Sequence, residues 1–104
     1  MSEYHFSIIT PGGKLFDDQV EAITAPGLEG SLGVLANHAP IIASLKEGVL
    51  TLRKNKTETY FAIRSGVLEV TQNGDTLVLA DDAIAVSNLQ DAQNQVNDFK
   101  RVEK

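Results

Sequence analysis

The chain of 104 residues contains no cysteine, which excludes disulfide bonds and any chemistry that needs a thiolate. The lack of cysteine also suits a reducing compartment. No apolar run reaches the roughly 18–20 residues that a helix needs to span a bilayer. The first ten residues, MSEYHFSIIT, have neither a basic start nor a long apolar core. We therefore expect no signal peptide and a protein that stays where it is made.

Basic side chains are too few for a nucleic-acid surface. Nine lysines and arginines stand against fourteen acidic residues, which gives a formal net charge of −5. Nucleic-acid-binding proteins normally carry a basic stripe. The densest basic cluster, Arg53 to Lys56, coincides with turn residues and is predicted to be a solvated hairpin tip. We therefore expect no nucleic-acid partner.

Apolar and polar residues alternate through the first 86 residues and predict eight or nine short strands. Turn signals separate these strands, and Asn73-Gly74 predicts a two-residue hairpin loop with positive φ at both positions. The predicted strands cover residues 4–9, 20–25, 32–35, 41–45, 49–52, 60–63, 67–70, 76–79 and 83–86. Many short strands at regular spacing favour a flattened antiparallel β-sandwich, and make a βαβ fold a poor fit.

The hydrophobic period changes after residue 86. Apolar residues then recur at steps of three and four and form one stripe of a predicted helix: Leu89, Ala92, Val96, Phe99 and Val102. Ser87 is the predicted N-cap, with Gln90 completing a capping box. Lys100, Arg101 and Lys104 suit the negative end of the helix dipole. The stripe needs a partner, either the sandwich itself or another subunit. We predict a sandwich domain, 1–86, and a helical region, 87–104.

The block from Pro26 to Leu50 is the most informative segment. Within it, the sixteen residues from Gly30 to Leu45 carry no formal charge. Its glycines, at positions 27, 30 and 33, predict tight backbone turns, because only glycine takes positive φ without steric cost. The block also contains more apolar residues than a short loop needs. It is either a buried strand pair or a surface that another protein covers.

The sequence offers little catalytic or metal-binding chemistry. Its two histidines, His5 and His38, lie far apart, whereas zinc catalysis needs at least three suitably spaced ligands. The segment Gly12-Gly13-Lys14 lacks the spacing of a phosphate-binding loop. We expect no metal, no cofactor and no enzymatic activity.

His38 has two interpretations. Its ring either bonds a backbone carbonyl and fixes the turn before Pro40, or it contacts a partner protein. An enzymatic alternative pairs His38 with Glu29 or Asp18 as acid and base, and it predicts a cleft that holds His38 next to a carboxylate.

The uncharged block closely resembles the signature of a known family. Residues 29–50 read EGxLGVLxxHAPIIxxLKxGVL, which resembles the epsilon subunit of rotary F-type ATP synthases and is similar to the mitochondrial delta subunit. Further family motifs follow in order: YHF at 4–6, LF at 15–16, VEAI at 20–23, SGVLEV at 65–70 and LAD at 79–81. The resemblance therefore covers nearly the whole chain.

The resemblance implies a β-sandwich of about ten strands followed by helices. It also implies a non-catalytic subunit at the foot of the rotor stalk, which clamps the gamma subunit and rests on the membrane c-ring. Such a subunit is peripheral to the membrane, at the cytoplasmic face of the bacterial inner membrane. The implied c-ring contacts are Glu29, Gly30, Ser31, Gly33 and His38. The implied gamma contacts are Ala39, Pro40, Ile41, Ile42 and Ala43.

Two departures from the family pattern affect these expectations. Many members carry an acidic residue at the position of Ser31, so charge-assisted pairing to the ring would depend here on Glu29 alone. Bacterial members typically end in a two-helix hairpin, which in some inhibits ATP hydrolysis and in some binds ATP. This sequence has one predicted helix and no Asp-x-x-Arg-Ala pattern. We expect rotor coupling without hairpin-type inhibition or ATP sensing.

A further alternative is a free-standing β-sandwich that binds a peptide or small ligand through the same uncharged block. This alternative predicts a stable monomer with a concave apolar groove. The stalk interpretation predicts obligate protein partners instead.

Overall fold

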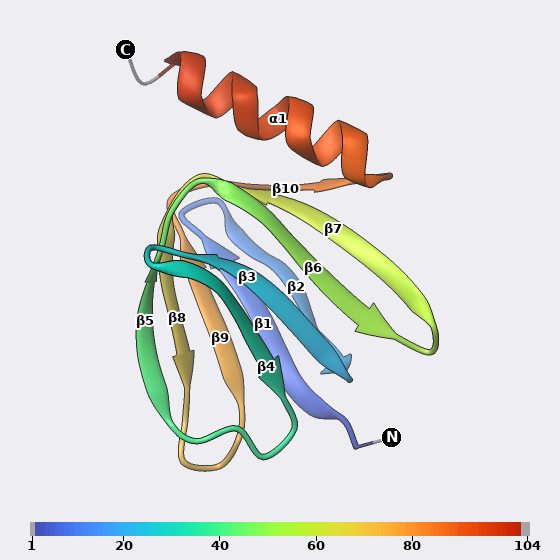
Figure 1. Cartoon of the computed structure of the whole chain (residues 1–104). Coiled ribbons are helices and arrows are strands. Elements are labelled where there is room, and N and C mark those ends of the chain that lie inside the picture. Colours follow the sequence, from blue (N-terminus) through green and yellow to red (C-terminus); the bar gives the residue numbers. More distant parts are fainter. Residues whose placement is uncertain (1, 103–104) are drawn as a thin grey trace.

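The computed structural model describes residues 2–102, with the side chains of residues 2–101, and it shows ten strands followed by one helix (Figure 1). The elements are β1 (Tyr4–Thr10), β2 (Gly13–Val20), β3 (Ala22–Gly27), β4 (Gly30–Leu35), β5 (Ile41–Leu45), β6 (Gly48–Lys54), β7 (Thr57–Ile63), β8 (Gly66–Val70), β9 (Thr76–Ala80), β10 (Ala83–Val86) and α1 (Leu89–Val102). This mainly β architecture with a C-terminal helix confirms the predicted fold class.

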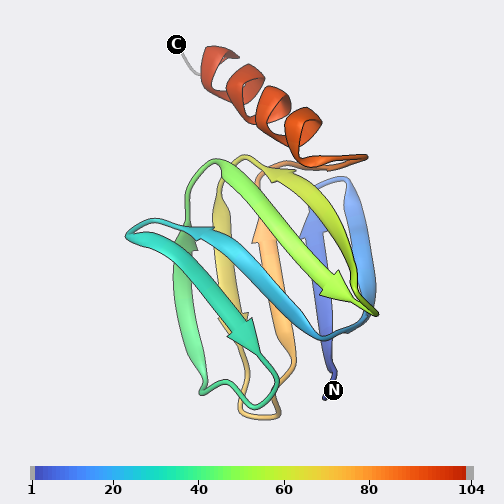
Figure 2. The ribbon, with the colours of Figure 1, turned by 45° about the vertical axis from the view of Figure 1, so that its right-hand side comes forward.

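The strands form a sandwich of two layers. One layer has the order β10-β7-β6-β3, with β4 paired to the other edge of β3, and the second has the order β5-β8-β9-β1-β2. The layers join where Gly27 of β3 pairs with Leu45 of β5. In Figure 2, β4 and β5 lie at the same side of the sandwich and diverge from this junction.

The core fills the space between the layers with alternate residues of each strand. Phe6, Ile8, Leu50, Ile63 and Leu68 are completely or almost completely buried. An aromatic chain crosses the core, because the ring of Phe16 lies 5.9 Å from that of Phe6 and 5.8 Å from that of Phe61. Close packing of this kind gives the sandwich a single rigid arrangement.

Three local features differ from the predictions. β2 was not predicted as a strand over its full length, because most of its side chains are polar and exposed and it pairs only with β1 among residues 2–102. β1 pairs with β9 in parallel, whereas every other pairing in the described chain is antiparallel. The hairpin predicted around Asn73-Gly74 is confirmed, because β8 and β9 pair antiparallel, but its two-residue turn is wrong. Gly74 has positive φ whereas Asn73 does not, and the Thr71 amide donates to the Asp75 carbonyl, so the loop is longer than two residues.

Helix α1 packs against the sandwich, which settles its position within the isolated chain. Ala92, Val96 and Phe99 are buried, the last two in one cluster with Ala62 and Ile84. Leu89 of the predicted stripe stays 45% exposed. The side chain of Val102 and all of Lys104 lie outside the described residues. The division into residues 1–86 and 87–104 stays a prediction, because this cluster belongs to both parts.

The predicted N-cap is wrong by one residue. The amide of Asp91 donates to the Asn88 side-chain oxygen at 2.9 Å, so Asn88 rather than Ser87 caps the helix. The side-chain amide of Asn88 also donates to the Asp91 carboxylate at 3.3 Å. The helix begins one residue later than the Ser87–Gln90 pattern predicted, because Asn caps at least as well as Ser.

Candidate functional site

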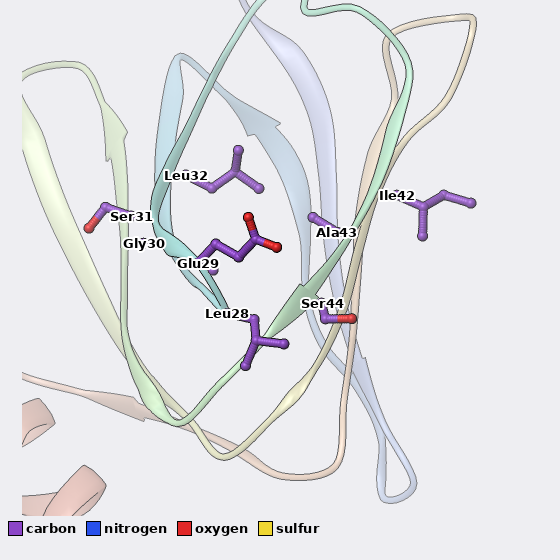
Figure 3. Close-up of a pocket in the computed structure, with 9 residues that line it drawn as sticks. Leu28, Glu29, Gly30, Ser31, Leu32, Ile42, Ala43 and Ser44 are labelled. Atoms are coloured by element: carbon purple, nitrogen blue, oxygen red, sulfur yellow. The ribbon is translucent and has the colours of Figure 1, made fainter.

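The tip of the β3–β4 hairpin and the middle of β5 form a pocket of about 450 Å³ (Figure 3). The lining residues are Gly27, Leu28, Glu29, Gly30, Ser31, Leu32, Ile42, Ala43 and Ser44. Three residues predicted to contact the c-ring, Glu29, Gly30 and Ser31, therefore line the same pocket as two residues predicted to contact gamma, Ile42 and Ala43. The backbone holds this junction together, because the Leu28 amide donates to the Ser44 carbonyl at 2.9 Å and the Lys46 amide to the Pro26 carbonyl at 2.9 Å.

The three glycines of the uncharged block have different structural roles, which corrects the prediction that all three sit in turns. Gly30 has φ of +133° and needs the freedom of glycine. Gly27 has no room for a side chain, because a Cβ atom would lie 2.5 Å from the Gly30 carbonyl oxygen. Gly33 lies inside β4, and a Cβ atom there would meet no other atom within 4 Å. Nothing in the described part of the chain therefore requires glycine at position 33.

Glu29 supplies the negative charge of the pocket. It is exposed at the turn and is the one charged residue among the nine that line the pocket. In Figure 3 its carboxylate extends into the space between Leu32 of β4 and Ala43 of β5. Among the residues that the structure describes, Glu29 has no ion-pair partner. The pocket thus combines apolar walls with one uncompensated acid.

An apolar strip follows the outer face of the second layer. Ile42 of β5 is 75% exposed, and Val67 of β8 and Leu79 of β9 are 39% and 51% exposed. Val67 pairs with Leu79, which in turn pairs with Ile9 of β1, so these apolar residues adjoin one another across three strands. Ile42 lies diagonally to Val67, because its own partner on β8 is Glu69. Val67 and Leu79 were not predicted as contact residues, although apolar residues at the outward positions of alternating strands were the available signal.

Other predicted contact residues lie away from the pocket. β4 has five residue steps from Gly30 to Leu35, about 17 Å at roughly 3.3 Å per residue, so Glu29 and His38 lie at opposite ends of the strand. Pro40, Ile41 and Ile42 line a second hollow with residues 69–73. Ile42 therefore borders both hollows.

His38 has the structural role that one of its two interpretations describes. Its ring Nδ1 lies 2.7 Å from the Ala39 carbonyl oxygen, and its backbone amide donates to the Leu35 carbonyl at 3.2 Å. Asn37, just before it, has φ of +67°. The structure does not bring His38 together with Glu29, and Asp18 pairs instead with Lys54 at 3.6 Å. The geometry therefore gives no support to the acid–base alternative.

A polar network on β1 and β2 was not predicted. Asp17 accepts hydrogen bonds from Lys14 at 3.0 Å, from His5, and from Ser7 at 3.1 Å. The hydrogen bonds from Lys14, His5 and Ser7 lower the pKa of the Asp17 carboxyl to about 2. Both Ser7 and Asp17 lie at paired positions of the two strands, so the network fixes this edge of the sandwich.

Metal-binding clusters and membrane-spanning helices are both missing from the described chain. Residues 2–102 contain no cluster of three His, Asp or Glu side chains that could hold a metal ion. In the same range, no helix has both the length and the apolar character that crossing a membrane requires.

Comparison with known families decides the family of this sandwich. Residues 3–86 match the model of the family described as ATP synthase, Delta/Epsilon chain, beta-sandwich domain. The chain belongs to this family. The match agrees with the fold, since residues 3–86 contain all ten strands of the described structure.

Individual relatives support the family assignment. The ATP synthase epsilon chain of Caulobacter vibrioides is 42% identical over 84 residues, which cover 81% of this chain and 96% of that one. The ATP synthase epsilon chain of Rhodopseudomonas palustris strain BisA53 is 38% identical over 92 residues, or 88% of this chain and 67% of that one. The epsilon chain of Campylobacter curvus is 36% identical over 105 residues, which cover 98% of this chain and 81% of that one.

Solved structures show the same fold in mitochondrial assemblies. One chain of the Euglena gracilis mitochondrial ATP synthase OSCP/F1/c-ring structure superposes with a TM-score of 0.78 at 19% identity, covering 98% of this chain and 66% of that chain. One chain of the Tetrahymena thermophila mitochondrial ATP synthase central stalk/c-ring structure gives 0.70 at 14% identity, covering 99% and 98%. At these identities the likeness concerns the fold alone.

Proposed function

We propose that this chain is a non-catalytic subunit of the central stalk of an F-type ATP synthase, linking the gamma subunit to the c-ring and so coupling ion flow to ATP synthesis. The observation that carries the proposal is the family match over residues 3–86. The epsilon-chain names of its relatives and the central stalk/c-ring assembly that contains a similar fold support it. The proposal implies a peripheral position at the cytoplasmic face of a bacterial inner membrane.

The surface of the sandwich suits this role. The strip formed by Ile42, Val67 and Leu79 is an apolar surface of the kind that the centre of a protein interface contains. Of the five residues predicted to contact gamma, Ile42 offers a large apolar side chain at 75% exposure. The cross-strand ladders and the close-packed core resist deformation, which the transmission of torque requires.

The proposed contacts are those expected from the family signature, refined by the geometry. Glu29, Gly30 and Ser31 would meet the c-ring from the β3–β4 turn, and Gly33 and His38 from farther along β4 and beyond it. Ala39, Pro40, Ile41, Ile42 and Ala43 would meet gamma. Because Ile42 and Ala43 share the pocket with Glu29, the two interfaces would adjoin each other there.

We also propose that residues 88–104 do not inhibit ATP hydrolysis. Ala92, Val96 and Phe99 are buried against the chain's own sandwich, so this apolar face is already occupied. Deletion of residues 88–104 should then leave ATP hydrolysis by the assembled enzyme within about twofold of the wild type. A several-fold rise would contradict this part of the proposal.

Co-elution is the decisive experiment for the proposed function. The purified chain would be mixed with the gamma subunit of the same organism, and separately with a gamma–c-ring assembly, on a sizing column at physiological salt. The proposal predicts a stable one-to-one complex with gamma. Separate peaks in both mixtures would contradict the proposal. A stable monomer in both mixtures would favour the free-standing module that binds a ligand in its pocket.

A further inference from the structure

No strand of the described structure pairs with the outer edge of β4, and β4 carries no charged side chain. Proteins protect such edges with charges, prolines or a covering helix, because free backbone groups pair readily with other chains. The edge strand β2 carries Lys14, Asp17 and Asp18, and the edge strand β10 packs against α1 through Ile84. Residues 30–35 of β4 have neither protection.

Strand register shows which backbone groups are free. Gly27 and Gly30 close the two-residue turn, so alternate residues of β4 direct their amide and carbonyl groups toward β3. Ser31, Gly33 and Leu35 direct their amide and carbonyl groups away from β3, toward the outer edge. Two observations agree with this pattern. The Leu35 carbonyl accepts from the His38 amide, and Pro26, which is opposite Ser31, has no amide to donate.

The side chains beside this edge leave it accessible. Ser31 is small and exposed, and Gly33 has no side chain and nothing within 4 Å of its Cβ position. Leu35, at 60% exposure, and Leu28, at 62%, add apolar surface at the two ends of the strand. An incoming backbone would therefore reach the amides of Ser31 and Gly33 without displacing any side chain.

Glu29 indicates the charge of the incoming segment. Its carboxylate lies at the start of β4 and has no ion-pair partner within the described chain. A second copy of β4 would bring no cation, since residues 30–45 are uncharged. A lysine or arginine on the added segment would meet Glu29 at the rim of the new strand pair.

We propose that β4 accepts an extended segment of another rotor subunit as an added strand. The segment bonds the backbone of Ser31 and Gly33 and places a lysine or arginine beside Glu29. This inference rests on the proposed function, because the segment belongs to a partner in the same assembly. It adds the mode of contact, which is main-chain strand addition and not side-chain contact alone.

Hydrogen exchange at single-residue resolution tests the mode of contact. The chain alone would be compared with the chain in the co-eluting complex of gamma and c-ring. In the free chain, the amides of Ser31 and Gly33 should exchange fast and those of Leu32 and Val34 slowly. In the complex, Ser31 and Gly33 should slow by at least about 100-fold, as expected when a free amide enters a ladder.

Two substitutions at one position provide a matched pair. Gly33→Pro removes the outward amide, and Gly33→Ala keeps it. Because the register gives that amide no partner among residues 2–102, both variants should keep the far-ultraviolet spectrum and the urea midpoint of the wild type. Gly33→Pro should weaken the complex about tenfold or more, and Gly33→Ala less than threefold. Equal effects on binding would overturn strand addition at this edge.

The charge has its own matched pair. Glu29→Gln should weaken the complex about tenfold at low salt, whereas Glu47→Gln, outside the pocket, should leave it unchanged. Equal effects of the two would overturn the basic character of the segment.

The outcomes separate this inference from the proposed function. A chain that never enters the complex on the sizing column would overturn the proposed function, and this inference with it. A chain that enters while Ser31 and Gly33 keep exchanging fast would overturn strand addition alone. Protection that grows with the concentration of the isolated chain would identify a second copy as the occupant and overturn the proposed partner.

Discussion

The phenolic hydroxyl of Tyr4 donates a hydrogen bond to the carbonyl oxygen of Val34 across 2.7 Å. Both residues are buried, at 7% and 1% exposure, and they lie 30 positions apart. The bond ties β1 of one layer to β4 of the other. It therefore holds in place the strand whose outer edge and turn form the candidate site.

Replacing Tyr4 by Phe should measure the strength of this tie. The variant leaves the Val34 carbonyl without the phenol, so we expect a loss of about 1–2 kcal/mol in the free energy of unfolding, read from urea denaturation. Tyr60→Phe is the matched control, because the Tyr60 hydroxyl bonds the exposed Glu58 carboxylate at 2.8 Å. An equal loss of unfolding free energy in Tyr60→Phe would show that the buried hydrogen bond of Tyr4 stabilises the fold no more than the exposed one of Tyr60.

The glycines of the β3–β4 hairpin should respond differently to substitution. Gly30→Ala forces a side chain onto φ of +133° and should cost about 1–3 kcal/mol of unfolding free energy. A Cβ atom at position 33 would meet no atom within 4 Å, so Gly33→Val should change the stability of the isolated chain by less than about 0.5 kcal/mol. In the assembled enzyme, Gly33→Val should disturb coupling of ATP hydrolysis to ion transport. Intact assembly and coupling in that variant would contradict the contact assigned to Gly33.

The cap of α1 gives a prediction that distinguishes two neighbouring residues. Asn88→Ala removes the acceptor of the Asp91 amide and should lower the unfolding free energy by about 1 kcal/mol, with a loss of helical ellipticity at 222 nm. Ser87→Ala should have little effect on either quantity. The reverse result would restore Ser87 as the cap.

These examples show how far the sequence alone could predict this structure. Alternation located nine strands, and the three-and-four stripe located α1, because both signals are burial patterns that one segment carries by itself. β2 was not predicted because most of its side chains are polar and exposed, and the inward-facing Phe16 and Val20 do not by themselves make an alternating apolar pattern. The parallel pairing of β1 with β9 joins segments about 70 positions apart, and no local pattern specifies it.

Part of the pocket lining could be located from the sequence, but its arrangement could not. The uncharged block and its flank placed Glu29, Ser31 and Ile42 close in sequence, and the structure shows that all three line one pocket. The segment from Glu29 to His38 was predicted as one contact region, whereas β4 separates its two ends. Residues 30–35 form a strand and not a turn because they pair with β3, and the sequence of this segment alone does not specify that pairing.

Acid should weaken the β1–β2 edge through Asp17. Its pKa in the folded chain, about 2, lies below the ordinary value of 3.8, so its contribution to stability is present above pH 3.8 and is lost as the pH falls toward 2. The difference in unfolding free energy between the wild type and Asp17→Asn should therefore shrink over this interval in urea denaturation. Asp18→Asn serves as the control on the same strand. A difference that stays constant from pH 5 to about 2 would contradict the role of Asp17.

The exposed apolar strip should matter for assembly and not for folding. Ile42 is 75% exposed and pairs with Glu69 of β8, so Ile42→Lys places a cation in water beside an acid. The unfolding free energy of the isolated chain should change by less than about 0.5 kcal/mol. Binding to gamma should weaken by about 100-fold or more, because a charge would enter the apolar centre of the interface without a partner. Leu15→Lys is the control, since Leu15 is an exposed leucine on β2, outside the strip. Equal weakening by both variants, measured by titration with purified gamma, would show that the strip is not the gamma surface.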